Sequence, residues 1–327
     1  MMLMSSDLNW LPDLINKLEK KSVRESYGNT LASVGSDKRV VVLDADLSTS
    51  THTSMFQKKY PDRFFNVGIS ENNMMGVASG LSWTGKKVFV SSFAIFATGR
   101  AYDFVRQSVC YSDSDVRIVA THAGLTVGED GATHQMLEDI GLMSGLPNMR
   151  VLVPADALET EQIVRYVYDN RGPFYVRLSR ERVPVVHDSE TFKYGKAETI
   201  ADGSDVTIIA TGILVSAAKI ATAYLKQKGI SVRVLNMATI KPIDIEAIEK
   251  SARETGRIVT AEEHSIYNGL GSRVAEVVAD RYPVPVKRLG VNDVFGESGK
   301  SWELMDKYGL SPMGIVNKVE EITKVKI

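Results

Sequence analysis

The sequence has little of several features that mark specialised classes of protein. Cys110 is the only cysteine among 327 residues, so no disulfide can form within the chain, and we expect a reducing, cytoplasmic location. The formal net charge is −1, from 39 basic and 40 acidic residues, which predicts no general affinity for nucleic acid or for a membrane surface. No run approaches the roughly 20 apolar residues that span a bilayer, and we expect no export signal. These absences favour a soluble enzyme whose partners bind at local sites.

Apolar segments alternate with helical patterns along most of the chain. This alternation predicts an α/β fold with a parallel sheet. The expected strands of the first half are Arg39 to Leu43, Lys87 to Val90, Val116 to Ala120, Arg150 to Val153 and Phe174 to Leu178. The second half repeats the alternation, with expected strands from Asp205 to Ala210, Ser231 to Leu235 and Arg257 to Thr260.

The chain is long enough for two domains, since a typical domain uses roughly 150 residues. Leu11, Leu14, Ile15 and Leu18 fall at helical spacing, which predicts a helical leader over residues 1–21. We predict a first domain over 22–183 and a linker over the polar residues 184–203. A second, smaller α/β domain is predicted over 204–327.

One loop after an expected strand combines residues that a folding core does not need. It runs from Ala120 to His134 and contains His122, Asp130 and His134 together with three glycines. Glycines let the backbone approach a ligand closely, while the histidines and the carboxylate supply donors, acceptors and titratable groups. The alternative is a solvated polar loop. The combination favours a binding site for a polar substrate.

Two features of the first half have both a structural and a functional interpretation. Glu71 follows a turn at Gly68 and begins an expected helix, where an acidic residue also suits the helix dipole. Phe93 and Phe96 are three residues apart, a spacing that usually indicates core packing. In the second half, Gly269 and Gly271 match two of the three glycines of a dinucleotide-binding loop. No suitable acidic residue follows, so a glycine-rich turn into a helix is favoured there.

These segments, in this order, resemble the pyrimidine-binding and C-terminal domains of transketolase. The resemblance extends from about Arg24 to Gly314. The matching motifs are Gly-Ile-Ser-Glu71, the Phe93/Phe96 pair, Gly128-Glu-Asp-Gly-Ala-Thr-His134, Leu-Ser-Arg180, Thr260-Ala-Glu-Glu-His264 and Phe295-Gly-Glu-Ser-Gly299. Deoxyxylulose-phosphate synthases share the Gly-Glu-Asp-Gly-x-Thr-His form only in part, and 2-oxoacid dehydrogenase β chains share less of it.

One family element is missing from the sequence. Full-length transketolases begin with a domain in which a Gly-Asp-Gly motif and an Asn pair bind the diphosphate of thiamine diphosphate through a divalent metal. No Gly-Asp-Gly occurs here. The resemblance therefore implies the C-terminal subunit of a split transketolase, with Mg²⁺ or another divalent cation bound mainly by a separate N-terminal subunit. We expect an α2β2 heterotetramer with a homodimeric β2 core.

The resemblance also implies roles for the cofactor residues. Glu71 would bond the aminopyrimidine ring nitrogen of thiamine diphosphate, and Phe93 and Phe96 would stack on the pyrimidine. Ile69 corresponds to an apolar wedge that keeps the cofactor bent. Asp46 corresponds to a residue at the edge of the cofactor site. The family often has a third aromatic at the position of Gly99, and Tyr102 is a candidate to replace it.

A second set of residues corresponds to the family's substrate site. Arg24, Ser50, His122 and Arg180 match positions that bind a sugar phosphate. Asp130 and His134 match positions that contact the hydroxyls of the ketose donor and shuttle protons. The implied reaction moves a two-carbon ketol unit from a ketose phosphate to an aldose phosphate, as in pentose phosphate metabolism. Three alternatives stay open: a deoxyxylulose-phosphate synthase fragment, a 2-oxoacid dehydrogenase β chain, and a non-catalytic binding or regulatory subunit.

Overall fold

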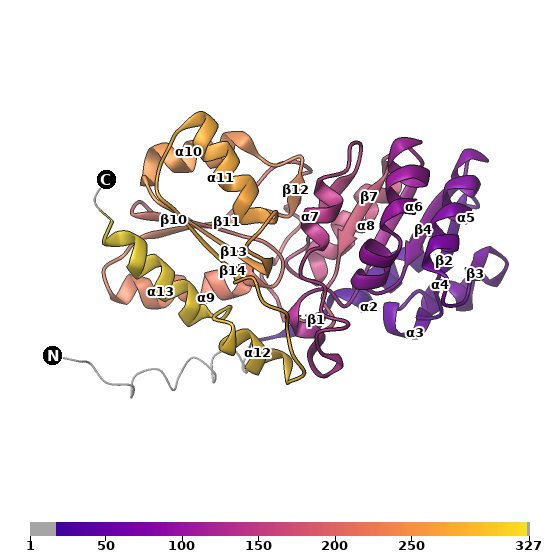
Figure 1. Cartoon of the computed structure of the whole chain (residues 1–327), viewed down its shortest axis with the longest axis horizontal. Coiled ribbons are helices and arrows are strands. Elements are labelled where there is room, and N and C mark those ends of the chain that lie inside the picture. The colour runs from indigo at the N-terminus through magenta and orange to yellow at the C-terminus, as the bar shows by residue number, and fades with distance from the viewer. Residues whose placement is uncertain (1–17, 326–327) are drawn as a thin grey trace.

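A computed structural model describes residues 18–325, which form two α/β units side by side (Figure 1). The first unit contains a seven-stranded sheet in the order β12-β6-β7-β5-β4-β2-β3. Its strands are β2 (Val40–Asp44), β3 (Phe64–Asn66), β4 (Lys87–Ser91), β5 (Val116–Ala120), β6 (Arg150–Leu152), β7 (Phe174–Arg177) and β12 (Thr239–Lys241). All neighbours in this sheet are parallel except β12, which pairs antiparallel with β6.

Helices cover both faces of the first sheet because its strands are apolar on both sides. In β2, Val40 and Val42 face one core cluster, while Val41 and Leu43 face the other, as the alternation of a strand requires. The first cluster includes residues of α2 (Val23–Val34), α4 (Ser54–Lys59) and α8 (Ala157–Asp169), and the second includes residues of α5 (Glu71–Trp83) and α7 (Asp139–Ser144). Shorter helical turns are α3 (Ser48–Thr51), α6 (Tyr102–Phe104), two π-helical segments at Ile95–Arg100 and Val105–Tyr111, and 3-10 turns at Pro61–Arg63 and Leu125–Asp130.

The second unit contains a five-stranded sheet in the order β14-β13-β10-β11-β9. Its strands are β9 (Glu198–Ala201), β10 (Val206–Ala210), β11 (Val232–Asn236), β13 (Ile258–Ser265) and β14 (Val286–Val291). Helices α9 (Leu214–Gln227) and α13 (Pro312–Thr323) lie on one face, while α10 (Ile245–Thr255) and α11 (Leu270–Arg281) lie on the other (Figure 1). Helix α12 (Ser301–Lys307) packs against the Leu125–Asp130 turn of the first unit.

The predicted two-domain α/β class is confirmed, but three details differ from the sequence-based expectation. Of the leader predicted over residues 1–21, residues 1–17 lie outside the described residues, and Lys20 and Lys21 belong to a strand, β1 (Lys20–Ser22). Strand β1 pairs antiparallel with β8 (Arg182–Pro184), and this pairing replaces the expected end of the helix. Strand β9 lies inside the predicted linker, and β12, from the predicted second domain, joins the first sheet. The domain boundaries therefore stay a prediction.

The carboxyl edge of the first sheet positions the candidate site. Four neighbouring parallel strands, β7, β5, β4 and β2, end at this edge, and β3 extends it. Open α/β sheets bind ligands outside the carboxyl ends of their strands, where the connecting loops are free to carry polar groups. In residues 18–325, no helix is both long and apolar enough to cross a lipid bilayer.

Candidate active site

The loops at this edge bring together residues that are far apart in the sequence. Phe93 follows β4, His122 follows β5 and Arg180 follows β7. Ser50 follows β2, and Glu71 follows β3 at the first position of α5. The loops after β4 and β5 are joined directly, because the amide of Ala94 donates to the carbonyl of Thr121 at 2.8 Å. The topology thus explains why five separate motifs converge on one edge.

Four aromatic rings form the centre of the site. The Phe93 and Phe96 rings are stacked with centroids 6.1 Å apart, and the His122 ring stacks on Phe93 at 3.8 Å. His134 meets Phe96 edge-on at 5.5 Å. Phe93 is therefore a shared contact of the predicted cofactor and substrate residues. The three-residue spacing, which usually indicates core packing, here joins two rings at the site.

Glu71 is buried beside this ring cluster, with only 2% of its surface exposed. Its carboxylate accepts hydrogen bonds from the guanidinium of Arg100, at 3.1 Å to Oε2 and 3.3 Å to Oε1. The same guanidinium lies 4.5 Å above the Phe96 ring. Ile69, two residues before Glu71, is 77% exposed and belongs to neither core cluster. Sequence reasoning missed Arg100, although its position four residues after Phe96 could have indicated a shared face of a helical segment.

Arg24 and Arg180 lie next to each other at the same sheet edge and form a cationic wall, the pair of positive charges at the site. Arg24 donates from Nη1 to the carbonyl of Ser50 at 2.7 Å and from Nε to the carbonyl of Arg180 at 3.1 Å. Arg180 donates to the Glu129 carboxylate at 2.9 Å. Burial and the neighbouring Arg180 charge lower the pKa of Arg24. A site that holds two neighbouring guanidinium groups favours an anionic ligand.

The imidazole of His122 lies in the same cationic environment. Burial, followed by the charges of Arg24 and Arg180, lowers its pKa to about 3, so the ring is neutral near pH 7. Its Nδ1 lies 2.8 Å from the hydroxyl of Thr121. His122 has a φ of 57°, a left-handed conformation that is costly for a non-glycine residue and that is often found at functional sites. His52, with a φ of 64°, has its pKa lowered by burial and by Arg24.

The remaining predicted residues occupy the rim of the site. Asp130 is exposed, and His134 is half-buried with its Nδ1 at 2.9 Å from the hydroxyl of Thr133. Asp46 is exposed and accepts a hydrogen bond from Asn66 at 2.8 Å. Tyr102 lines a separate pocket of about 500 Å³ with Leu142 and Tyr267, and within residues 18–325 it makes no ring contact with Phe93 or Phe96. Arg100 rather than Tyr102 covers Phe96.

Residues of the second unit contact and support the loop from Ala120 to His134. Gly124 has a φ of 84°, and a side chain there would clash with the Glu263 carboxylate. The Oε1 atom of Glu263 accepts from the amide of Thr126 at 2.6 Å, and burial raises the pKa of Glu263 to about 7 although Arg177 opposes this shift. Gln135 donates to the carbonyl of Glu297 at 2.9 Å. The motifs around Glu263 and Glu297 thus support the loop and do not line the site itself.

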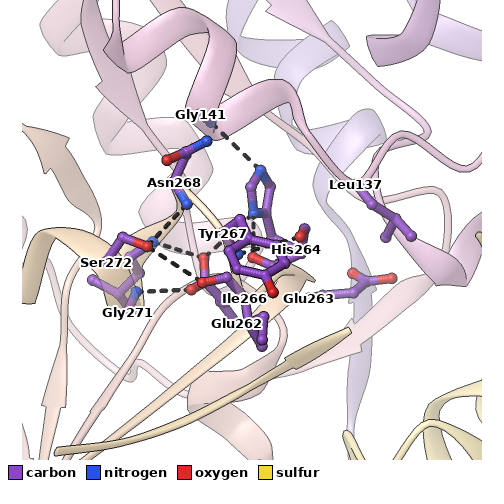
Figure 2. Close-up of polar contacts among 12 residues, drawn as sticks. Leu137, Gly141, Glu262, Glu263, His264, Ile266, Tyr267, Asn268, Gly271 and Ser272 are labelled. Atoms are coloured by element: carbon purple, nitrogen blue, oxygen red, sulfur yellow. Dashed lines mark hydrogen bonds and ion pairs between the residues drawn. The ribbon is translucent and has the colours of Figure 1, made fainter. Parts of the chain in front are cut away.

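The rest of the Thr260 to His264 motif contacts the first residues of helix α11 and a loop of the first unit (Figure 2). The Glu262 carboxylate accepts hydrogen bonds from the amides of Leu270 and Gly271, at 2.7 and 2.8 Å, at the start of α11. His264 accepts a long 3.5 Å hydrogen bond from the amide of Gly141 in the first unit. The turn at Gly269 therefore begins a helix whose first amides are bonded to a carboxylate. The sequence predicted such a glycine-rich turn into a helix in preference to a dinucleotide-binding loop.

Comparison with known proteins agrees with this architecture. Residues 19–185 match the family model "Transketolase, pyrimidine binding domain", and residues 195–315 match "Transketolase, C-terminal domain". The chain therefore belongs to the transketolase family, whose members carry out thiamine-diphosphate-dependent ketol transfer. This confirms the family resemblance stated from the sequence.

The relatives narrow this assignment to one kind of transketolase chain. The chain is 49% identical over 309 residues to a "Putative transketolase C-terminal section" of Methanocaldococcus jannaschii, covering 93% of this chain and 97% of that protein. It is 40% identical to the "6-deoxy-6-sulfo-D-fructose transketolase subunit SqwH" of a Clostridium species, covering 95% and 97%. A solved structure described as "Split gene transketolase, inactive beta4 tetramer" matches with a TM-score of 0.87 and 48% identity, covering 94% and 100%. The chain thus matches a transketolase C-terminal section and a split-gene transketolase chain over nearly the whole length of each.

Proposed function

We propose that this subunit, together with an N-terminal subunit, transfers a two-carbon ketol unit from a ketose phosphate to an aldose phosphate. The observation that carries the proposal is the position of Glu71 and the Phe93/Phe96 pair beside His122, Arg24 and Arg180 at one sheet edge. The first group suits a flat, nitrogen-containing ring, and the second suits a terminal anion. Pentose phosphate metabolism in the cytoplasm is the setting that we infer for this reaction.

The chain's residues fit one half of thiamine diphosphate. Glu71 offers a buried carboxyl for a ring nitrogen, and the ring pair offers an aromatic face. Ile69 and Asp46, both exposed, are free to contact the rest of the cofactor at the edge of the site. Thiamine diphosphate supplies the nucleophilic carbon for ketol transfer when it is bound. Glu71 would hold its pyrimidine in the tautomer that activates this carbon, and its burial strengthens such a hydrogen bond.

The sugar phosphate would lie along the same loops. Arg24, Arg180, His122 and the Ser50 segment would bind the terminal phosphate, because paired guanidiniums suit its oxygens. Neutral His122 donates or accepts a hydrogen bond there without adding a third positive charge. Asp130 and His134, on the rim, would orient the donor hydroxyls and move protons to and from them.

A partner subunit is part of the proposal. Nothing in the sequence resembles a Gly-Asp-Gly diphosphate motif, so the diphosphate and its Mg²⁺ would be bound mainly by the N-terminal subunit. The similar split-gene transketolase is described as inactive in its β4 form. Several apolar side chains on the first unit are exposed, including Ile69, Trp83 and Tyr111, and offer surface for subunit contacts. We infer an α2β2 assembly around a β2 core.

Reconstitution tests the proposal directly. The chain is purified alone and also after co-expression with a separate N-terminal transketolase subunit that carries a Gly-Asp-Gly motif. Both preparations are assayed with xylulose 5-phosphate, ribose 5-phosphate, thiamine diphosphate and magnesium. We expect turnover only from the co-expressed pair. Rapid turnover by the lone chain would refute the need for a partner, and an inactive, fully assembled complex would refute the reaction.

A second experiment tests the role of Glu71 separately from turnover. In the assembled enzyme, Glu71→Gln should slow deuterium exchange at the thiazolium C2 of bound thiamine diphosphate by about 10²- to 10⁴-fold, the usual contribution of a proton-transfer group. Circular dichroism and a melting curve serve as controls for folding. Unchanged exchange in a folded variant would remove Glu71 from the activating role.

A further inference from the structure

A second cluster of chemically active side chains lies away from the candidate active site. Glu159 on α8, His187 in the segment after β8 and Glu198 on β9 each offer one ligand atom, and these atoms all lie within 4.8 Å of one another. Glu159 and His187 are buried, and Glu198 is half-buried. From this geometry we propose that the cluster binds one divalent transition-metal cation of the Zn²⁺ type.

The histidine lies between two carboxylates. Its Nδ1 lies 3.0 Å from Oδ2 of Asp156 without forming a hydrogen bond, and this oxygen accepts hydrogen bonds from the amides of Val186 and His187 at 2.8 Å. With a cation in place of the proton between His187 and Glu198, a carboxylate beside Nδ1 favours the tautomer whose Nε2 has a free lone pair. This Nε2 faces Oε2 of Glu198 at 2.9 Å, a separation close to that of two ligands on one metal ion.

The buried carboxylate is held in place as well. Glu159 Oε2 accepts from the amide of Ala155 at 2.6 Å, and its Oε1 accepts from Nδ2 of Asn236 at 2.8 Å. Asn236 is 1% exposed, and its own Oδ1 has no hydrogen-bond partner. Its Nδ2 also lies 3.4 Å from His187 Nε2. The two ends of an amide are interchangeable in position, so a half-turn directs the orphaned oxygen at the cluster as a fourth ligand.

Charge and access both favour a cation. Asp156, Glu159 and Glu198 place three carboxylates around one imidazole. Lys219, the lysine on the wall of the adjoining pocket, donates to the carbonyl of Val186 at 3.0 Å. This pocket, of about 370 Å³, is lined by His187 and Glu198 and gives an entry path for an ion. One imidazole nitrogen among carboxylate oxygens suits Zn²⁺ better than Mg²⁺ or Ca²⁺, which prefer oxygen ligands alone.

The location suggests what the ion would do. It would join α8 of the first unit, the connecting segment and the second sheet, where Glu198 pairs in register with Asn236. The connecting segment comes directly from β8, which pairs with β1. Arg24 follows β1 and Arg180 precedes β8, so a bound ion would stabilise the strand pair next to which both arginines lie.

The test measures metal binding by the full chain. After treatment with a chelator, the chain is titrated with ZnCl₂ by calorimetry and with CoCl₂ by visible absorption, with excess MgCl₂ present to occupy sites for hard cations. We expect one Zn²⁺ per chain, a visible Co²⁺ spectrum that Zn²⁺ abolishes, and a higher melting temperature with Zn²⁺. His187→Gln and the half-buried Glu198→Gln should each weaken Zn²⁺ binding by at least about tenfold. Glu161→Gln, on the exposed side of α8, is the matched control and should bind normally.

Two outcomes would overturn the metal site. One is the absence of saturable Zn²⁺ or Co²⁺ binding by the folded, chelated chain. In that case His187 bridges the carboxylates as a protonated imidazolium without a metal. The other is unchanged binding in both folded variants, which would place the ion elsewhere. Because the readout is metal binding by this chain, neither outcome depends on the reaction that the assembled enzyme catalyses.

Discussion

Replacement of Arg180 by glutamine gives a sharp test of the phosphate-binding wall. In the structure the Arg180 guanidinium donates to the carbonyl of Val127 and to the Glu129 carboxylate, and its side chain is 31% exposed. To bind a phosphate it has to loosen the pair with Glu129. That pair is largely exposed and contributes at most about 1 kcal/mol. A charged hydrogen bond to phosphate contributes about 1.5 to 3 kcal/mol, so the exchange favours the substrate.

The expected effect separates phosphorylated from unphosphorylated donors. In the assembled enzyme, Arg180→Gln should raise KM for xylulose 5-phosphate roughly ten- to hundredfold, which is the same free energy expressed as a ratio. KM for hydroxypyruvate, a donor without phosphate, should stay nearly unchanged. Arg182→Gln is the matched control, because Arg182 is exposed on neighbouring β8 and, within residues 18–325, donates only to the carbonyl of Lys20. Equal losses on both donors would show that Arg180 merely supports the loop.

The same variant has a spectroscopic consequence. The charge of Arg180 is one of the causes that hold the pKa of His122 near 3, after burial and the charge of Arg24. Removing it should raise this pKa, which a pH titration of the imidazole by NMR can follow. Loss of loop structure alone would expose the ring and also raise the pKa. The Phe93 contact distinguishes the two cases, because ring-current shifts of His122 persist only if the stack survives.

The fold was largely predictable from the sequence because its strands are short apolar runs buried on both faces. Strands β4, β5 and β10 begin within one residue of their expected positions, since local hydrophobicity alone specifies such strands. Strands β1, β3, β8, β9, β12 and β14 were not predicted. All except β14 have only three or four residues, and each depends on a distant pairing partner, which no local pattern reveals.

The residues of the candidate site that belong to a local sequence motif were predictable from the sequence. The sequence singled out Glu71, Phe93, His122 and Arg180, and the topology places all four at one sheet edge. Arg100 was missed because its significance comes from two contacts, with Glu71 and with Phe96, that exist only after folding. The Glu159, His187 and Glu198 cluster was missed for the same reason. Its members come from a helix, a connecting segment and a strand with no common spacing.

Three further changes test other parts of this structure. Arg100→Gln should tighten binding of thiamine diphosphate to the assembled enzyme, measured by fluorescence quenching, if Arg100 competes with the pyrimidine for Glu71 and Phe96; weaker binding would make Arg100 a ligand of the cofactor instead. Gly124→Ala should lower the melting temperature, because it adds a side chain at positive φ against Glu263, whereas exposed Gly80→Ala, in a helix with open space around it, should not. Glu263→Gln should change how stability depends on pH. The pKa of the Glu263 carboxyl is raised from 4.5 to about 7 by burial, so between these values the folded chain keeps a proton that the unfolded chain has lost. The contribution of Glu263 to stability is therefore fully present below pH 4.5 and is lost as the pH rises towards 7, by about 3 kcal/mol at 1.36 kcal/mol per pKa unit. A glutamine keeps the shape but does not ionise, so the free energy of unfolding of the variant relative to the native chain should increase by about this amount between pH 4.5 and 8 in denaturant titrations. Glu276→Gln, at an exposed position of α11, should show no such trend, and a difference for Glu263→Gln that stays constant with pH would mean that Glu263 is already ionised in the folded protein.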